Sequence, residues 1–328
     1  MPRRLVNLTL LVAVVMLLAT GVAAWLIPDT TAGPLVLAHR VAGIALAAAL
    51  VWKYAMARRS LRRRGPSASV WVGIATAILA VLALVLGVAW TAGLVSFDRP
   101  LAYSALNLHV FAGLGAGALV AVHALMRAES RPRLVSLAGR RAALRGMGLL
   151  AVSFAGSAAL DRLGLARRAT GSRHAGSFTG NSFPVTIWSF DTVPTIDLAS
   201  WRLVVRGGDD ASTQVSLRYA DILALPRREA SVVLDCTGGW WTEQVWTGVG
   251  LEEVLARAGV AAGATRVEVV SVTGHRWAFD RSESGRAILA THVGGEPLAP
   301  GHGYPVRLVA PGLRGFLWIK WVGEVVVA

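Results

Sequence analysis

Cys236 is the only cysteine in the 328-residue chain, and it lies in the stretch "SVVLDCTGGWW". The apolar run before it is typical of a buried strand and "TGG" of a tight turn, so the sulfur is expected at a strand end. Such a thiol can be a small buried hydrophobe, or a nucleophile that needs a histidine base. It can also bind a soft metal whose remaining ligands come from an organic cofactor. The adjacent residues supply no histidine, and the third role requires further residues that hold a large polar cofactor.

Candidate residues for that task lie further along, in "GHGYPVRLVAPGLRGFLWIKW". Glycines punctuate this stretch, and its donors are suited to a phosphate and a polar heterocycle. The alternative is a solvated basic strand and hairpin, and the residues alone favour neither. The donors are His302, Arg307, Arg314 and Lys320.

Three of the seven histidines, His39, His109 and His123, lie in strongly apolar surroundings. His39 and His109 each stand near the start of an apolar run, so they are expected at similar depth in a membrane. His123 follows His109 by 14 residues, about 21 Å and close to four helical turns, so these two share a helix face. Two facing imidazoles can bind haem iron, with Arg40 near enough to pair with a propionate. Alternatively, each histidine is an interfacial polar residue bonded to loop carbonyls.

The elements around these histidines are membrane helices. A hydrophobic fraction of 54% and a mean hydropathy of +0.54 are too high for an ordinary soluble domain, and the excess lies in the first half. Four runs there approach the ~20 residues of a spanning helix. The arginines fall in blocks between them, as in cytoplasmic loops, so the net charge of +14 reflects membrane topology and nucleic acid is not an expected partner. The runs are Leu5–Ile27, Leu35–Met56, Val70–Leu94 and Leu106–Met126.

The basic connectors also predict an orientation. They precede the first run and follow the second and fourth, which places these segments in the cytoplasm and the C-terminal part on the outer, periplasmic face of the cell membrane. A fifth apolar run, Gly146–Leu160, is short for a span and follows the paired Arg140 and Arg141. The pair is either part of a basic loop before a marginal helix or a twin-arginine export signal.

From about residue 172 the pattern changes to short strands separated by Gly, Pro and Asp turns, interrupted by the helix "GLEEVLARAGV". We therefore predict an all-α transmembrane bundle of four to five helices followed by a mixed α+β domain. The expected boundaries are 1–128 for the bundle, 129–171 for a basic loop, fifth segment and linker, and 172–328 for the second domain.

The motif order of the second domain is specific. "LDCTGGWW…VWTGVGLEEVL", "VEVVSVTG" and "GGEPLAPGHGYPVRLVAPGLRGFLWIKWVGEVVV" resemble the molybdopterin-binding domain of the sulfite oxidase family, especially the catalytic subunits of periplasmic methionine sulfoxide reductase. The likeness covers about Phe178 to Ala328 and implies that Cys236 is the one protein ligand to molybdenum. It further implies cofactor contacts from Asn181, Ser271, His302, Arg307, Trp318, Ile319 and Lys320.

The chain also departs from that family. Pro184 and Val185 stand where the reductases have an aromatic and an acidic residue, and a histidine at position 302 is closer to the sulfite-oxidising members. After the cysteine, the sulfite oxidases carry arginines that help to bind their anion. Here a neutral sulfoxide or N-oxide could rest on an indole, although the tryptophans could equally be wall packing. The candidate pocket residues are Trp240, Trp241 and Glu243.

The first half resembles transmembrane b-type cytochromes, whose helices carry histidines fourteen residues apart and hold two haems. His109 and His123 keep that spacing, but Lys53 stands fourteen residues after His39. One haem b on His39 and His109 is therefore expected, whereas a second would need His123 and an unusual partner.

Together these observations predict a membrane-anchored molybdenum oxidoreductase. It would transfer an oxygen atom from a sulfoxide or N-oxide, for example methionine sulfoxide, with electrons from the quinol pool relayed by haem. The alternatives are a sulfite-type dehydrogenase that passes electrons to the membrane, and a non-catalytic binding module on a membrane anchor.

Overall fold

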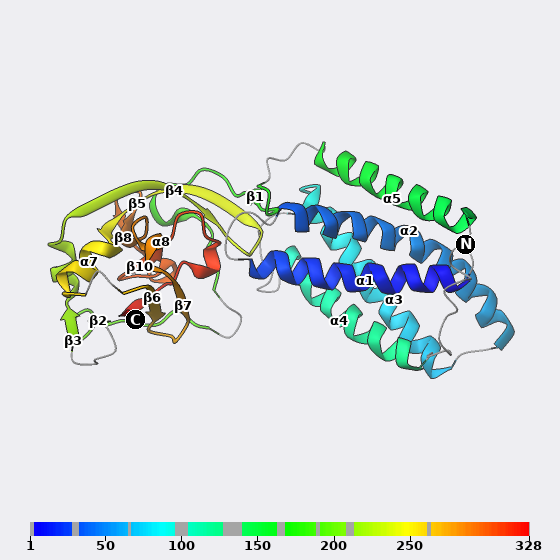
Figure 1. Ribbon diagram of the computed structural model, residues 1–328, viewed down its shortest axis with the longest axis horizontal. Helices are drawn as coiled ribbons and strands as arrows, with labels where there is room; N and C mark the ends of the chain where they lie inside the picture. The colour runs from blue at the N-terminus through cyan, green and yellow to red at the C-terminus, as the bar shows by residue number, and fades with distance from the viewer. Residues whose placement is uncertain are drawn as a thin grey trace. The chain divides into compact units, whose positions relative to one another are not determined.

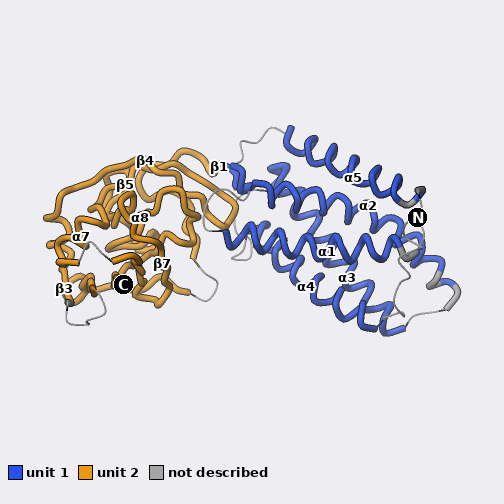
Figure 2. Tube along the Cα trace, in the orientation of Figure 1, with its two compact units in different colours: residues 1–27, 31–173 blue, residues 28–30, 174–328 orange. Residues whose placement is uncertain are grey.

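Two compact units make up the protein in the computed structural model (Figures 1 and 2). One comprises residues 1–27 and 31–173, and the other residues 28–30 and 174–328. The structure describes residues 3–27, 33–64, 67–95, 104–126, 140–162, 168–187, 191–207, 213–260 and 264–327.

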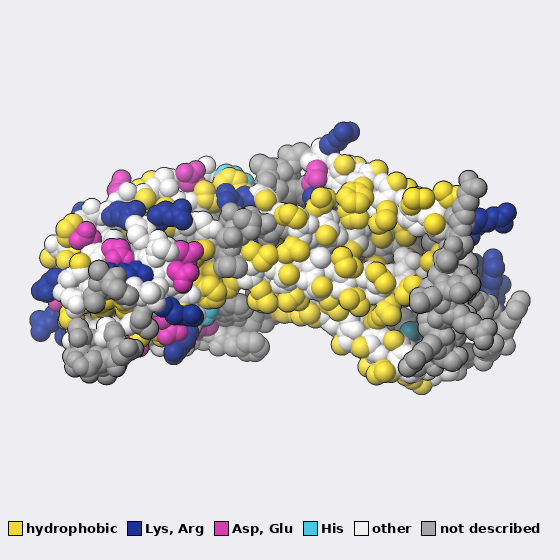
Figure 3. Space-filling view, viewed as in Figure 1, with side chains coloured by type: hydrophobic (Ala, Val, Ile, Leu, Met, Phe, Trp, Pro, Cys, Tyr) yellow, Lys and Arg dark blue, Asp and Glu magenta, His cyan; other side chains and the backbone are white. Residues whose placement is uncertain are grey.

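The first unit is helical, and each of its five helices is long and apolar enough to cross a membrane. Hydrophobic side chains cover the visible face of this unit (Figure 3). Helix α1 packs on α2 and α3 on α4, while α5 packs on α2. The predicted N-terminal region of long apolar helices is therefore confirmed. The helices are α1 (Arg3–Leu26), α2 (Gly33–Arg64), α3 (Ala68–Thr91), α4 (Ala105–Met126) and α5 (Arg140–Asp161).

Helix α5 is longer than the fifth apolar run in the sequence. It begins at Arg140 and Arg141 and reaches Asp161, and its candidate span covers Ala143–Asp161. The helix includes polar residues at both ends of the apolar run, which is why hydropathy alone made it look short. The proposed role of the arginine pair as an export signal stays a prediction, and residues 127–139 before it lie outside the described part of the chain.

The chain leaves α5 beside the start of α2. Both terminal nitrogens of Arg40 donate to the carboxylate of Asp161, so the guanidinium expected to meet a propionate is already paired with α5. Further on, Ala169 lies against Gly33, and Arg173 donates to the Val95 carbonyl oxygen at 2.7 Å while it covers the Trp90 ring. The segment after α5 is thus fastened at the end of the bundle where α2 begins.

The second unit contains two sheets, which confirms the predicted mixed α+β domain. In the five-stranded sheet, the order is β3-β2-β11-β6-β7, with β2 and β11 parallel and the other pairs antiparallel. Its strands are β2 (Leu203–Gly207), β3 (Thr213–Leu217), β6 (Arg266–Ser271), β7 (Arg276–Asp280) and β11 (Val322–Val327).

The six-stranded sheet is built around β5, which pairs with both β4 and β8. Gly248 lies where the β5–β8 register shifts, and a Cβ there would collide with the Leu289 carbonyl, so the close approach requires glycine. The order is β1-β5-β8-β10, with β4 on β5 and β9 on β8. The strands are β1 (Arg173–His174), β4 (Arg227–Asp235), β5 (Trp240–Gly250), β8 (Ile288–Val293), β9 (Glu296–Pro297) and β10 (Arg307–Val309).

Short helices connect these strands. The predicted amphipathic helix is α7 (Leu251–Arg257), and Leu251, Val254 and Leu255 are buried as its spacing indicated. Two turns that matter for the site are 3₁₀ helices, η2 and η3, which the sequence pattern did not reveal. The remaining elements are α6 (Tyr219–Leu223), α8 (Arg281–Ser284), η2 (Gly180–Ser182), η3 (Pro300–His302) and η4 (Gly315–Leu317).

Candidate functional site

Cys236 follows the last residue of β4 and is 7% exposed. The tight turn after it is closed by two backbone bonds, from Cys236 N–H to the Trp240 carbonyl (2.8 Å) and from Gly239 N–H to the Cys236 carbonyl (2.9 Å). The Gly238 N–H donates to Sγ at 3.3 Å. A Cβ on Gly238 would lie 3.5 Å from Sγ and 3.3 Å from the indole nitrogen of Trp240. The sulfur is therefore held at a strand end, near the Gly238 amide and the Trp240 indole.

A second segment supports this strand end from its other side. A Cβ on Gly315 would lie 3.3 Å from the Cα of Cys236 and 2.8 Å from Leu234, so the "PGLRG" turn packs directly on the chain at Cys236. The preceding residue, Arg314, faces the Asp235 carboxylate, with Nε and Oδ1 3.7 Å apart and both side chains buried. Arg314, one of the predicted phosphate donors, is thus charge-paired within the protein.

Arg307 is a buried cation with a different environment. It is 3% exposed, donates to the His302 carbonyl oxygen at 3.1 Å, and lies over the rings of Trp246 and Trp318 at 5.2 and 5.7 Å. Its Nε has no hydrogen-bond partner, and no carboxylate in the described ranges forms an ion pair with it. Burial lowers the pKa of Arg307 to about 10, although Cys236 acts in the opposite direction. A buried guanidinium of this kind fits an anionic ligand such as a phosphate.

His302 lies next to Arg307 and is 1% exposed. Its Nε2 lies 2.9 Å from the Asn181 carbonyl oxygen, and its ring stacks on Phe183 with the centres 3.9 Å apart. Nδ1 has no hydrogen-bond partner within the part of the chain that the structure describes. Burial, together with the positive charge of Arg307, lowers the pKa of His302 to about 4, so the ring is neutral at pH 7. An imidazole nitrogen is therefore left for a ligand.

Asn181 and Lys320 fix the turns around His302. The Asn181 amide donates to the Pro297 carbonyl (2.9 Å) and accepts from Ala299 N–H (2.7 Å), which ties η2 to η3. Lys320 Nζ donates to the carbonyls of Gly301 (2.6 Å) and Thr186 (2.8 Å). Both residues thus act on the backbone of the site.

The other members of the "WIK" triplet are buried beside these groups. Trp318 donates to the Leu313 carbonyl at 3.2 Å and covers Arg307, whereas Ile319 is a core residue whose carbonyl accepts from Leu308. Phe183, Thr186 and Trp246 belong to the same region, and the motifs did not single them out. Thr186 accepts a hydrogen bond from the Trp240 indole at 3.2 Å. Trp246 could have been predicted from the sequence, because it lies six residues after Trp240 and therefore on the same face of the strand.

Three predicted residues lie elsewhere. Ser271 is buried at the end of β6 and shares a hydrogen bond with Thr273 at 3.0 Å. Trp241 stacks on His174 with ring centres 4.5 Å apart, and the exposed Glu243 accepts from Ser231 at 2.8 Å. Side chains alternate along β5, so Trp241 and Glu243 face away from the side that carries Trp240. Of the three candidate pocket residues, the structure brings only Trp240 beside Cys236.

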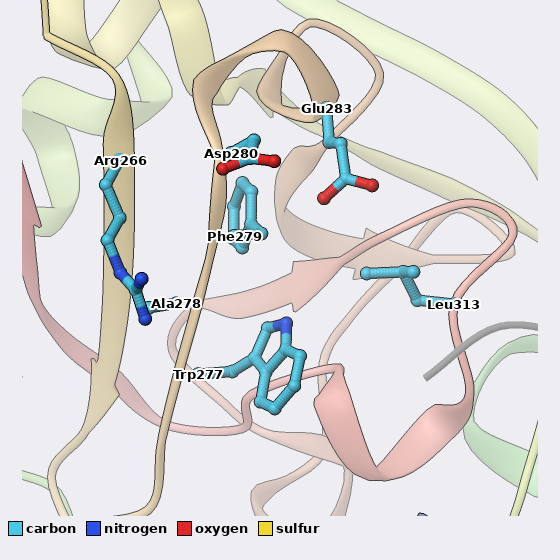
Figure 4. A pocket seen from close by; sticks show the side chains of 7 residues that line it. All are labelled: Arg266, Trp277, Ala278, Phe279, Asp280, Glu283 and Leu313. Carbon is cyan, nitrogen blue, oxygen red and sulfur yellow. The ribbon is translucent and has the colours of Figure 1, made fainter. Parts of the chain in front are cut away.

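A hollow on the surface of this unit lies between β6, β7, α8 and the turn before η4 (Figure 4). None of the predicted site residues lines it. Its lining comprises Arg266, Trp277, Ala278, Phe279, Asp280, Glu283 and Leu313.

We predict that burial of His302 makes the cofactor-free protein less stable at acidic pH. Its pKa falls from 6.5 to about 4 on folding, so the unfolded chain binds more protons between these values. The free energy of unfolding is therefore highest above pH 6.5 and decreases as the pH falls towards 4, by up to about 3 kcal/mol. We expect His302→Gln to flatten this dependence in urea titrations followed by tryptophan fluorescence at pH 7 and 4.5. Equal acid losses in both proteins would contradict the prediction.

In the helical unit, His39 and His109 lie together. Their ring centres are 5.9 Å apart at an angle of 76°. His109 Nδ1 lies 2.7 Å from the Ala83 carbonyl oxygen, so Nδ1 carries the proton. His39 Nδ1 lies 3.2 Å from the Thr20 hydroxyl, which itself donates to Met16, so this Nδ1 is again the donor. Both rings are therefore oriented with a lone pair on Nε2, as in metal-binding histidines.

Each histidine of this unit packs against a glycine of the preceding helix. A Cβ on Gly21 would lie 2.9 Å from Cε1 of His39, and one on Gly87 would lie 3.0 Å from Cε1 of His109. The third histidine, His123, has the same contact with Gly73 at 3.0 Å. His123 does not join the His39–His109 pair, because it lies fourteen residues further along α4.

Comparison with known proteins identifies the second unit. Residues 190–328 match the oxidoreductase molybdopterin binding domain family. The uncharacterized oxidoreductase YuiH of Bacillus subtilis is 33% identical over 146 residues, which cover 43% of this chain and 71% of that protein. The mitochondrial sulfite oxidases of Rattus norvegicus and Homo sapiens are each 30% identical over 181 residues, which cover 46% of this chain. The match spans about a third (32%) of their length.

The chain belongs to this family of molybdopterin-binding oxidoreductases. Its C-terminal unit is an oxidoreductase molybdopterin-binding domain of the sulfite oxidase type. Among solved structures, the sulfane dehydrogenase SoxCD from Paracoccus pantotrophus matches with a TM-score of 0.38 and 24% identity over 41% of this chain and 40% of that one.

Proposed function

We propose that this chain is a membrane-anchored molybdenum enzyme that reduces a neutral sulfoxide or N-oxide, for example methionine sulfoxide. The electrons would come from quinol in the cell membrane and pass through a haem b bound by His39 and His109. The observation that carries the proposal is the combination, in one chain, of a molybdopterin-binding oxidoreductase domain with a pair of oriented imidazoles 5.9 Å apart in apolar helices.

The residues of the second unit fit the molybdenum cofactor. Cys236 offers one buried sulfur, which suits a metal whose other ligands belong to an organic cofactor. Arg307 offers a buried cation for a phosphate, and His302 offers Nδ1 for a polar heterocycle. The bound cofactor would supply two-electron oxygen-atom transfer. Asn181 and Lys320 hold the surrounding turns in place, and the buried indole of Trp240 excludes water beside the sulfur.

The histidine pair fits haem. The ring centres of His39 and His109 lie 5.9 Å apart, and these two imidazoles would hold the haem iron. The hydrogen bonds of Nδ1 to Thr20 and Ala83 would fix the ring orientation and raise the basicity of the coordinating nitrogen.

The surroundings of Cys236 favour a neutral substrate. The side chain beside the sulfur is the Trp240 indole, and the nearby Arg314 faces the Asp235 carboxylate, which offsets its charge. Arg307, whose guanidinium interacts electrostatically with Cys236, is assigned here to the phosphate, and a neutral sulfoxide can rest on the aromatic face of Trp240. The sulfite-type dehydrogenase is the second candidate, because the relatives include sulfite oxidases. The non-catalytic binding module is not favoured by the family match.

Topology supports the relay. The segment after α5 is fastened near the start of α2, where His39 also lies. The chain therefore leaves the helical unit at the end that carries the histidine pair. Under the positive-inside rule this end lies on the outer, periplasmic side.

The proposal is tested on the purified full-length protein. We expect about one molybdenum and one low-spin haem per chain. With a reduced viologen as electron donor, methionine sulfoxide, dimethyl sulfoxide and trimethylamine N-oxide should be reduced. Oxidation of sulfite with ferricyanide, without reduction of these compounds, would instead support the dehydrogenase.

Substitution of the paired histidines should separate the two redox sites. We expect His39→Ala and His109→Ala to lose the low-spin haem spectrum and at least about 100-fold of the quinol-dependent rate. Their viologen-dependent rate should stay within about twofold of wild type, because the molybdenum site is intact. His123→Ala is the matched control and should keep the haem. Unchanged haem content in His39→Ala would contradict the assignment.

A further inference from the structure

The helical unit repeats one hairpin arrangement at two levels. In α1–α2 and in α3–α4, the second helix of each hairpin carries the histidine and the first carries the facing glycine. On α4, His109 and His123 are fourteen residues apart, and on α3 so are Gly87 and Gly73. Fourteen residues correspond to about 21 Å along a helix and nearly four turns. We call the level of His39 and His109 the first level, and that of His123 the second level.

The second level has an equivalent position on the other hairpin. Fourteen residues from His39 on α2 is Lys53, and fourteen residues from Gly21 on α1 is Asn7. These two side chains are in contact, because Lys53 Nζ donates to Asn7 Oδ1 at 2.8 Å. Three of the four equivalent positions therefore hold a histidine packed on a glycine, and the fourth holds a lysine bonded to an asparagine.

The glycine–histidine pairs and the Asn7–Lys53 pair differ in what they can bind. A glycine leaves room for an imidazole, because a Cβ at any of the three glycines would lie 2.9–3.0 Å from Cε1 of the facing histidine. An ammonium group donates hydrogen bonds and has no lone pair for iron, and here it is directed to the Asn7 amide. The second level therefore offers one imidazole, from His123, where the first level offers two.

We propose that the Lys53–Asn7 contact replaces a histidine–glycine contact at the second level, so that the native bundle binds one haem, at the first level. Replacing Asn7 by glycine and Lys53 by histidine would complete a second bis-imidazole site with His123. This inference rests on the proposed haem at the first level. In addition, the side chains of Asn7 and Lys53 prevent haem binding at the second level.

The test is haem stoichiometry, measured by pyridine haemochrome, with optical and low-temperature EPR spectra of full-length protein in detergent. Wild type should bind about one haem and N7G/K53H about two, with a second low-spin signal. The matched control N7G/K53Q removes the Lys–Asn couple without adding an imidazole and should stay at one. Adding H123A to N7G/K53H should return the count to one.

Other outcomes overturn the inference in distinguishable ways. One haem in N7G/K53H, with the first-level signal intact, would refute the second site and leave the proposed function standing. Two low-spin haems in wild type, or loss of haem in H123A alone, would show that His123 is already a ligand. No haem in wild type or in any variant would refute the proposed relay and this inference together. The wild-type and H123A measurements are decisive even if N7G/K53H does not fold.

Discussion

Cys236→Ser is expected to lower oxygen-atom transfer by at least about 100-fold, because substitution of residues that only orient a metal ligand already costs 10- to 100-fold. Serine is nearly isosteric with cysteine, and Cys236 is buried in a turn that is closed by backbone bonds, so the fold should persist. The pterin should remain, since Arg307 and His302 are unchanged. Viologen-dependent turnover is measured alongside the pterin and molybdenum content.

The matched control is Trp241→Phe, five residues away on the opposite face of β5. It should keep turnover within about twofold, because that ring packs on His174 and not beside the sulfur. Turnover of Cys236→Ser within twofold of wild type would remove the cysteine from the chemistry and leave the buried-hydrophobe role.

The second large effect concerns two buried arginines that should respond oppositely. In cofactor-free protein, Arg307→Met removes a buried cation that has no ion-pair partner in the described chain, so the free energy of unfolding should stay within about 1 kcal/mol of wild type or rise. In cells that make molybdopterin, the same variant should lose at least about 90% of its molybdenum, because the phosphate loses its cation.

Arg314→Met provides the contrast. It removes the cation that faces the buried carboxylate of Asp235, and the cofactor-free protein should lose about 3–5 kcal/mol of stability. Urea unfolding and metal analysis of both variants distinguish the two roles. If Arg307→Met unfolds as readily as Arg314→Met, Arg307 serves the fold and not an anionic ligand.

Much of this architecture could be predicted because the signals are local. Runs of about 20 apolar residues gave the helices, and the strand-then-"TGG" pattern placed Cys236 at a strand end, where the structure has it. The pairing of His39 with His109 was predicted from their similar distances to the starts of the apolar runs, and the rings do lie together.

The remainder depends on contacts between distant segments. The pairing of Arg314 with Asp235 and the bond of Trp240 to Thr186 join parts of the chain that have no common pattern in the sequence. The separation of Trp241 and Glu243 from Trp240 has a local cause. Strand β5 begins at Trp240, immediately after the turn, and a one-residue shift of that start reverses every side chain.

The attachment of the segment after α5 has a kinetic consequence. Arg40 and Asp161 join α2 to α5, and Arg173 is held on Val95 and Trp90, so the segment that leads out of the helical unit is held at the end of the bundle where α2 begins. The two redox sites proposed here belong to one chain and are therefore covalently linked. Under the proposed relay, a covalent link sets an effective concentration that reaches the millimolar range for flexible linkers, well above that of a separate subunit diffusing to its partner. Electron delivery then becomes a first-order event, and turnover per molecule should be independent of dilution.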